Sequence, residues 1–258
     1  MTLLTQADGE YARTQLDNGC ATMERLLHGL LDAKGRVAEE VHTLRKLGKS
    51  LRGGFSLFQL KGAAREIQGI GRLLSGSRDA VSRLNTWQKL DWEKELSVSR
   101  AILSLLDQHT HSAARRPPQQ TIEWCHERIT EARKSLLGLP PEILEKTTRA
   151  GAKGLQRNLR NCFSTLDLRD AENFHDARKA LKAVMGATGF LPPRADVPDP
   201  QIAAIADQLG DENDLATLSK WLRQHGFTEK FAAGLWKRIE KTRRALRKQI
   251  IAGAEGLF

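Results

Sequence analysis

The stretch VHTLRKLGKSLRGGFSLF at residues 41–58 decides the fold, together with the related stretch FHDARKALKAVMGATGF at residues 174–190. Both contain the pattern H-x-x-R-K-x-x-K, and the second copy follows the first by 133 positions, as His42 and His175 show. Successive residues of an α-helix lie about 100° apart around its axis. The cations of the first copy therefore occupy one arc and its apolar residues another, with centres roughly 120° apart. The basic row borders the buried stripe, which favours a groove between helices.

Acidic residues are missing beside this basic row. No Asp or Glu occurs from residue 41 to residue 65. A solvated helix face usually mixes acids with bases, because opposite charges soften the repulsion between neighbouring cations. The uncompensated row therefore predicts an anionic ligand.

Composition gives the fold class and a preference for polyanions. The 258 residues include 41 Lys and Arg against 31 Asp and Glu, a formal net charge of +10, which favours association with polyanions. Aromatic residues make up only 5% of the chain, and long alternations of Val, Ile and Thr are absent. Leu, Ala, Arg, Lys and Glu recur with helical spacing instead, so we predict an all-α protein.

The cysteines and the N-terminus bear on where the protein works. Cys20, Cys125 and Cys162 are too few and too scattered for a disulfide framework or a zinc site, and we expect small core residues in a reducing compartment. The N-terminal sequence lacks a signal-like pattern, and no apolar run is long enough to span a membrane. The sequence predicts a cytoplasmic protein with no membrane partner.

Helical periodicity divides the chain into eleven expected helices. These lie at residues 10–32, 38–60, 63–74, 78–90, 92–111, 121–137, 142–166, 171–189, 202–209, 214–225 and 228–252. Gly53-Gly54 is expected to weaken the end of the second helix. Pro117-Pro118 cannot continue a helix, so residues 115–120 are a predicted linker between a first repeat at 1–114 and a second at 121–258.

A second pair of related segments supports the repeat. LSGSRD at residues 74–79 is similar to LGDEND at residues 209–214, each with Leu five positions before an Asp. Two such copies would pack about a pseudo-twofold axis. Asp79 and Asp214 are expected to cap the helices that follow them, or to pair with cations of a neighbouring row.

The doubled H-x-x-R-K-x-x-K helix and the two L-[SG]-x-x-[RN]-D segments resemble the CHAD domain, the conserved histidine α-helical domain. The resemblance covers roughly residues 10–252. It implies two four-helix bundles related by internal pseudo-twofold symmetry, with a basic central cavity that binds inorganic polyphosphate. Family members are associated with polyphosphate granules, and some are fused to a triphosphate-tunnel domain, which is not visible here. One departure is Met185, which occupies the position of Arg52 in the second copy.

Two further basic rows follow from spacing alone. Residues 146–160 place five cations within an arc of about 80°, with no acid between Glu145 and Asp167. The row Lys237, Lys241, Arg244 and Lys248 on the last helix is expected to be a solvated face. The predicted polyphosphate-binding residues combine both histidines with the nearby cations: His42, Arg45, Lys46, Lys49, Arg52, Arg149, Lys153, Arg157, Arg160, His175, Arg178, Lys179 and Lys182.

Nucleic acid is the alternative ligand for a basic helical protein. Proteins that bind single strands usually stack bases on aromatic side chains. The five tryptophans lie outside the histidine helices, at spacings that favour core positions: Trp87, Trp92, Trp124, Trp221 and Trp236. Nucleic-acid binding is therefore expected to be weak and nonspecific.

Catalysis is the third reading, and the sequence offers no pattern for it. A phosphoryl-transfer site needs carboxylates that hold a metal or a phosphate-binding loop, and GxxxxGK[ST] is absent. Glu93-Lys94-Glu95 reads as a helix surface, and the acids at 211–214 read as a capped turn. The pairs His109 with His111 and Cys125 with His126 lack further metal ligands. We therefore predict a non-enzymatic module with no cofactor and no metal, which targets polyphosphate granules or assists proteins on them.

Overall fold

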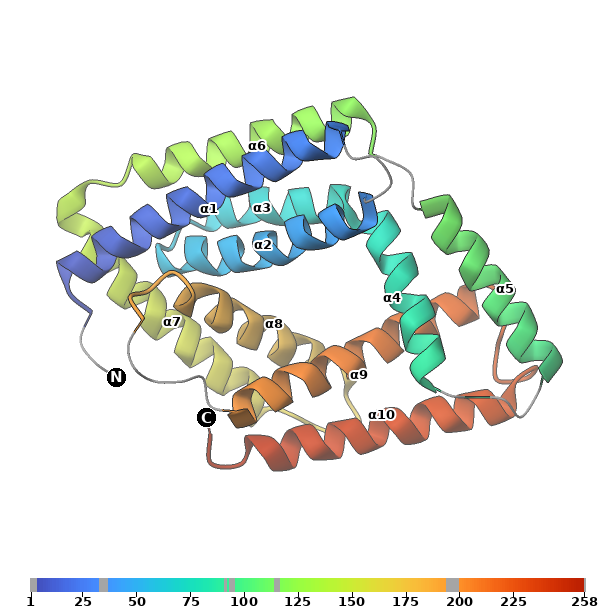
Figure 1. Ribbon diagram of the computed structural model, residues 1–258. Helices are drawn as coiled ribbons and strands as arrows, with labels where there is room; N and C mark the ends of the chain where they lie inside the picture. The colour runs from blue at the N-terminus through green and yellow to red at the C-terminus, as the bar shows by residue number, and fades with distance from the viewer. Residues whose placement is uncertain are drawn as a thin grey trace. The chain divides into compact units, whose positions relative to one another are not determined.

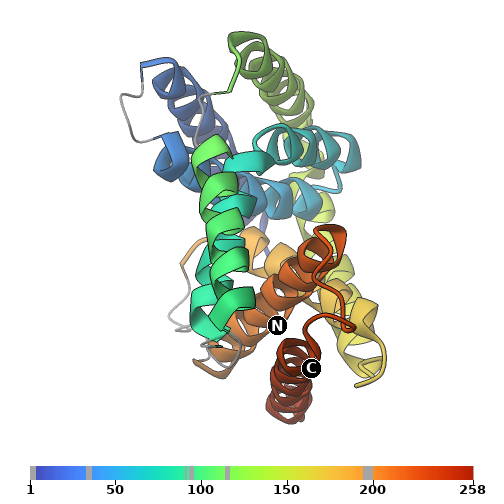
Figure 2. The same cartoon turned by 90° about the vertical axis from the view of Figure 1, so that its right-hand side faces the viewer.

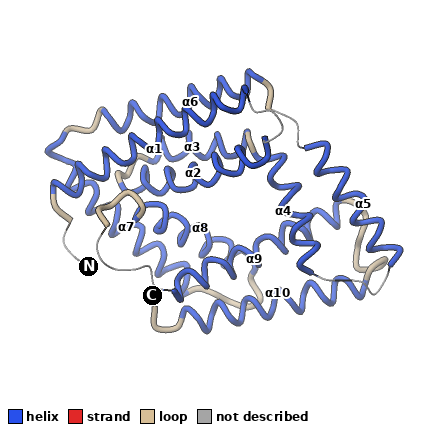
Figure 3. Tube along the Cα trace, in the orientation of Figure 1, coloured by secondary structure: helices blue, strands red, loops and turns tan. Residues whose placement is uncertain are grey.

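The computed structural model describes residues 4–32, 37–90, 92, 96–113, 117–193 and 200–257. Within these residues every regular element is helical (Figure 3), which confirms the all-α prediction. Ten α-helices and one 3-10 turn follow one another in the order shown in Figure 1: α1 (Gln6–Asp32), α2 (Val37–Leu57), α3 (Lys61–Leu73), α4 (Ser75–Leu90), α5 (Leu96–Ala113), α6 (Gln119–Leu137), η1 (Pro141–Ile143), α7 (Leu144–Ser164), α8 (Ala171–Thr188), α9 (Pro200–Gln224) and α10 (Ala233–Ala254).

Most predicted boundaries agree with these helices to within one turn, and α1 shows why its start differs. Thr5 and Asp8 form reciprocal hydrogen bonds, in which the Thr5 backbone N–H donates to the Asp8 carboxylate and the Asp8 N–H donates to the Thr5 hydroxyl. This capping arrangement satisfies donors that the first turn leaves open. The helix therefore begins at Gln6, one turn before the predicted Glu10. Residues 93–95, and residues 114–116 with the first two positions of the predicted linker, lie outside the described residues.

The two helices predicted at residues 202–209 and 214–225 are wrong, because α9 is one continuous helix. Asp214 lies within it and caps nothing. Asp79 is likewise the fifth residue of α4, so the capping prediction fails for both aspartates. The segment LGDEND contains no proline, and its one glycine costs a helix only about 1 kcal/mol relative to alanine. Burial of the flanking Leu209 and Leu215 offsets that cost.

The described residues form two compact units, and each draws segments from both halves of the chain. The first unit spans Met1–Ser75, Arg115–Asn161 and Lys179–Val197. In it α1, α2, α3 and α6 contact one another in a closed ring, which makes a four-helix bundle. Its core includes Leu16, Leu44 and Ile129. The predicted repeats at 1–114 and 121–258 are related in sequence and are not the same as these compact units. The division into repeats stays a prediction.

The second unit spans Gly76–Ala114, Cys162–Arg178 and Pro198–Phe258. Here α4, α5, α9 and α10 surround a core rich in tryptophan and leucine, including Trp87, Ile102 and Leu222. Helices α9 and α10 lie side by side, orange and red in Figures 1 and 2. Helix α8 contributes its first part to this unit and the rest, from Lys179, to the first unit.

Within the first unit, α2 and α8 touch through two glycines. A Cβ atom on Gly53 would lie 2.6 Å from the Ala183 carbonyl oxygen, and a Cβ atom on Gly186 would lie 3.1 Å from the Ser50 Cα. Only glycine lets two helix backbones approach this closely. The expectation that Gly53-Gly54 weakens the end of α2 is therefore wrong, because the helix continues to Leu57 and the glycines serve packing.

These contacts are reciprocal between the two copies of the histidine stretch. Gly53 corresponds to Gly186, and Ser50 corresponds to Ala183, at the same spacing of 133 positions. Gly53 of the first copy contacts Ala183 of the second, and Gly186 of the second copy contacts Ser50 of the first. Such exchanged contacts are what a twofold relation produces at its axis. The pseudo-twofold symmetry of the whole repeats stays a prediction.

The α2–α8 contact predicts a strong effect of Gly53→Ala. The added methyl group would collide with backbone atoms of α8, which cannot rotate away, so we expect the free energy of unfolding to fall by about 1–3 kcal/mol. Chemical denaturation with urea, followed by circular dichroism, measures this change.

Gly29→Ala is the matched control. Gly29 lies within α1 and a Cβ atom there meets nothing within 4 Å, so the alanine should stabilise the helix by about 0.5–1 kcal/mol. Equal effects of the two substitutions would show that the close approach has no energetic role.

Candidate anion-binding site

The basic row of α2 lies partly on the surface of the first unit. His42, Lys46 and Lys49 are exposed, whereas Val41, Leu44 and Leu51 on the adjoining stripe are buried. The predicted placement of the cations beside the core stripe is therefore observed in this helix. Exposed ammonium and imidazole groups on neighbouring turns can all reach one extended anion.

Two arginines of this row are half-buried and have different surroundings. The Arg45 guanidinium donates a 3.0 Å hydrogen bond to the carbonyl oxygen of Gly71 in α3, so part of it holds α2 against α3. Burial lowers the pKa of Arg52, because removal of water disfavours the charged form. Arg52 remains charged at neutral pH, because the ordinary pKa of arginine is far higher. A half-buried charge of this kind gains from an anion nearby.

The basic row on α7 also contains both exposed and half-buried residues. Lys153, Arg157 and Arg160 are exposed. Arg149 is half-buried, and its Nη2 donates to the Leu4 carbonyl oxygen at 2.8 Å and to the Glu145 carboxylate at 2.6 Å. Arg149 therefore holds the N-terminal segment and has an acidic partner in Glu145.

On α8, His175, Arg178 and Lys182 are half-buried and Lys179 is exposed. His175 and Arg178 belong to the second unit, whereas Lys179 and Lys182 belong to the first. The predicted residues are thus spread over three helices and both units. Eleven of the thirteen lie in the first unit, at residues 42–52, 149–160, 179 and 182.

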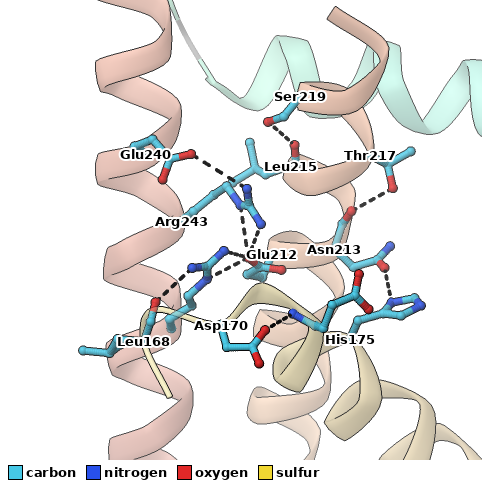
Figure 4. Close-up of polar contacts among 12 residues, drawn as sticks. Leu168, Asp170, His175, Glu212, Asn213, Leu215, Thr217, Ser219, Glu240 and Arg243 are labelled. Carbon is cyan, nitrogen blue, oxygen red and sulfur yellow. Dashed lines mark hydrogen bonds and ion pairs between the residues drawn. The ribbon is translucent and has the colours of Figure 1, made fainter. Parts of the chain in front are cut away.

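The orientation of His175 is set by Asn213 of α9, which sequence reasoning did not single out. The ring Nδ1 lies 3.0 Å from the Asn213 Oδ1, as Figure 4 shows. The Asn213 Nδ2 donates to Asp214, which also accepts a hydrogen bond from Ser82. Because the amide oxygen can only accept, this network assigns the proton to Nδ1. The other ring nitrogen, Nε2, has no hydrogen-bond partner among the described residues.

A buried ion cluster in the second unit is built around Glu212, the residue before Asn213 (Figure 4). One oxygen of Glu212, in α9, accepts hydrogen bonds from both Arg243 and Arg247 of α10, at 2.8–3.0 Å. Their side chains are 3%, 10% and 9% exposed, so water contributes little to their solvation. Sequence reasoning placed Glu212 in a capped turn, and this placement is wrong.

The same cluster fixes the start of α8. Arg247 also donates to the Leu168 carbonyl oxygen at 3.0 Å and lies over the ring of Phe174, with its guanidinium carbon 5.4 Å from the ring centre. Phe174 is buried and immediately precedes His175. The arginine therefore positions both the loop before α8 and its first turn. The opposite face of α10 carries exposed Lys237, Lys241, Arg244 and Lys248, as predicted for a solvated row.

Four of the five tryptophans are buried, at 3–7% exposure, as their spacing predicts. Trp124 is the exception at 46% exposure, so its core assignment is wrong. The core positions of α6 include Ile122, Cys125 and Ile129, and a residue two positions after Ile122 lies about 200° around the helix. Trp124 therefore points away from the core, and it lies on none of the helices that carry the basic rows.

The described residues contain neither a metal-holding cluster nor a membrane-spanning helix. Among them, no three His, Cys, Asp or Glu side chains lie close enough together to hold a metal ion. None of the described helices combines the length and the apolar character needed to cross a membrane. Cys20 and Cys125 are buried, and desolvation raises their pKa to about 12 and about 11, which makes both thiols unreactive.

Comparison with known proteins gives a consistent result. A sequence model of the CHAD domain matches residues 10–223. The fold is similar to PptA from Streptomyces chartreusis, with a TM-score of 0.68 and 15% identity, covering 95% of this chain and 96% of that one. It is also similar to the CHAD domain from the plant Ricinus communis, with a TM-score of 0.63 and 20% identity, covering 100% and 96%. No curated protein sequence matches the chain.

The buried cluster predicts that Glu212→Gln is severely destabilising. The substitution leaves two buried guanidinium groups without their shared carboxylate, and loss of one partner in a buried ion cluster costs about 3–5 kcal/mol. Urea denaturation measures the loss. Glu240→Gln is the control, because Glu240 is exposed and lies 3.9 Å from Arg243, so it should cost less than about 1 kcal/mol. Similar costs for the two variants would contradict a structural role for Glu212.

Proposed function

Because the chain belongs to the CHAD domain family, we propose that it binds inorganic polyphosphate through the basic rows of α2, α7 and α8. The family is associated with polyphosphate binding in general, and the rows supply the residues for it here. The binding residues proposed are those predicted from the sequence, and the basic central cavity expected from the family resemblance belongs to the same proposal.

The observation that carries the proposal is the position of two lysines beside the α2–α8 contact. Lys49 lies one helical turn before Gly53, and Lys182 lies one turn before Gly186. Since the backbones touch at these glycines, both lysines lie next to the same crossing in the first unit. Two cations from different helices beside one crossing can both attract the same bound polyanion.

Polyphosphate suits rows of this spacing. It carries about one charge per phosphate on a flexible chain, and cations one helical turn apart repeat about every 5.4 Å along an axis. Arginine can donate two parallel hydrogen bonds to phosphate oxygens, whereas lysine acts as a mobile point charge. Exposed Lys153, Arg157 and Arg160 would extend the contact along α7.

The two histidines supply directional contacts in this proposal. His42 is exposed, and His175 is oriented by Asn213 with Nε2 left over. A neutral Nε2 accepts a hydrogen bond, and a protonated one donates to a phosphate oxygen. Either ring can therefore make a directional contact with a bound phosphate.

The role we propose is non-enzymatic. The protein would act in the cytoplasm as a targeting or accessory module on polyphosphate granules, in contact with the polymer and with granule proteins. Weak, nonspecific nucleic-acid binding is the alternative. The burial of Trp87, Trp92, Trp221 and Trp236 disfavours it, because buried rings cannot stack on bases.

Charge reversal at the crossing tests the binding site. We expect Lys49→Glu with Lys182→Glu to weaken binding of long-chain polyphosphate by at least about 100-fold, because two attractive contacts become repulsive. Isothermal titration calorimetry over a series of salt concentrations measures the affinity, and the salt dependence should become shallower as fewer counterions are released.

Lys237→Glu with Lys241→Glu is the matched control, with the same change in net charge on the solvated face of α10. It should keep most of the affinity. Equal losses in the two variants would show that only net charge matters, and equal displacement of polyphosphate by DNA of matched charge would favour the nucleic-acid alternative.

A phosphate-release assay tests the absence of catalysis. Incubation of the protein with polyphosphate and Mg²⁺ or Mn²⁺ should release no phosphate above the protein-free rate, because no metal-holding group of three occurs among the described residues. Sustained phosphate release that is lost in the charge-reversed variant at positions 49 and 182 would contradict the non-enzymatic role and identify the protein as an enzyme.

A further inference from the structure

A groove with a chemistry opposite to that of the basic rows lies between α3 and α6 in the first unit. It encloses about 810 Å³ and is open to solvent along one side. The two helices run antiparallel (Figure 1) and contact each other along their length. The lining residues come from one stripe of each helix: Gly62, Ala63, Glu66 and Leu73 from α3, and Trp124, Glu127, Arg128, Glu131 and Ser135 from α6.

The groove is acidic in a strongly basic protein. Three carboxylates line it against one guanidinium, and that guanidinium, on Arg128, is already paired with Glu66. Glu127 is exposed, and Glu131 pairs with Lys134 at 2.8 Å where both side chains are more than 60% exposed, so the pair is easily exchanged. The groove therefore repels polyanions and attracts cations.

One end of the groove is apolar. Leu73 ends α3 and Trp124 lies near the start of α6, so the antiparallel arrangement brings them to the same end. Trp124 is 46% exposed and Leu73 is 38% exposed. Tryptophan is the aromatic residue most enriched at sites where proteins anchor a partner, because its ring offers a large apolar area and attracts cations.

We propose that this groove binds a cationic amphipathic helix of a partner protein. An aliphatic side chain of that helix packs on Trp124 and Leu73, and its lysines or arginines pair with Glu127 and Glu131. Antiparallel neighbours such as α3 and α6 form a trough that accepts a third helix. Trp124 and Glu131 are seven residues apart on α6, about 10.5 Å, which matches the anchor spacing i to i+7 on a bound helix.

This inference does not depend on polyphosphate binding. The groove lies on α3 and α6, and neither helix carries a residue of the proposed polyphosphate site. The two surfaces attract ligands of opposite charge. The protein could therefore hold a basic partner and the polymer at once, and each binding reaction can be measured without the other.

Fluorescence anisotropy of a labelled Leu/Lys peptide tests the proposal. The peptide has about 14 residues, roughly 21 Å as a helix, with leucines on one face and lysines on the other. It is titrated with the full chain in the absence of polyphosphate. We expect saturable binding that Trp124→Ala weakens by about tenfold, the usual cost of removing an aromatic anchor. Glu127→Gln with Glu131→Gln should weaken it by a similar factor at low salt.

The control for the double variant is Glu142→Gln with Glu255→Gln, which removes the same charge from two exposed residues that do not line the groove. It should leave the affinity unchanged within about twofold. Circular dichroism of every variant verifies that helicity is retained. Equal weakening in the two double variants, full binding by Trp124→Ala, or equal binding of a peptide with the same residues in scrambled order would each overturn the proposal. Concentration-dependent self-association that the groove substitutions abolish would overturn it as well, in favour of a second copy of the chain.

Discussion

The close contact between α2 and α8 is the constraint on which the candidate site depends. At Gly53 and Gly186 no side chain separates the helices, so their backbones meet directly. Lys49 of α2 and Lys182 of α8 each lie one helical turn before the glycine of their own helix. Apolar packing alone would hold two helices about 8–10 Å apart. The glycines allow a shorter separation between the two backbones.

A second device positions the histidine of α8. Two arginines of α10 share one oxygen of Glu212, and one of them also supports the carbonyl oxygen of Leu168 and the ring of Phe174. A buried cluster of this kind contributes little net stability when it is complete. Its effect is geometric, because one carboxylate oxygen of Glu212 holds both guanidinium groups in place. His175 directly follows Phe174, so the contacts that fix Phe174 also fix the position of the His175 backbone.

Periodicity in the sequence was enough to predict the helical class, most helix boundaries and the position of the α2 row beside the core. It failed where tertiary contacts override local signals. The segment LGDEND looks like a turn but lies inside α9, because the buried leucines on either side pack best in one helix. Glu212 looked like a cap because its partners lie about 30 residues away, and Gly53 looked like a weak point because its neighbour is on another helix.

Trp124 was assigned to the core by residue type, although the angular position around α6 was available and points outward. The binding role of the basic residues stays a prediction, since exposure and charge alone do not identify a ligand.

The reciprocal glycine contact also limits how the two copies of the histidine stretch can evolve. The two stretches differ at most of their equivalent positions, including a charged one, where Arg52 in the first corresponds to Met185 in the second. Gly53 and Gly186 are not free to change in this way, because a side chain at either position would collide with the backbone of the other stretch. A larger residue on one side cannot be accommodated by a smaller one on the other, since nothing is smaller than glycine. Side chains of other sizes can be accommodated elsewhere in the two stretches, whereas these two positions must stay glycine for the helices to touch.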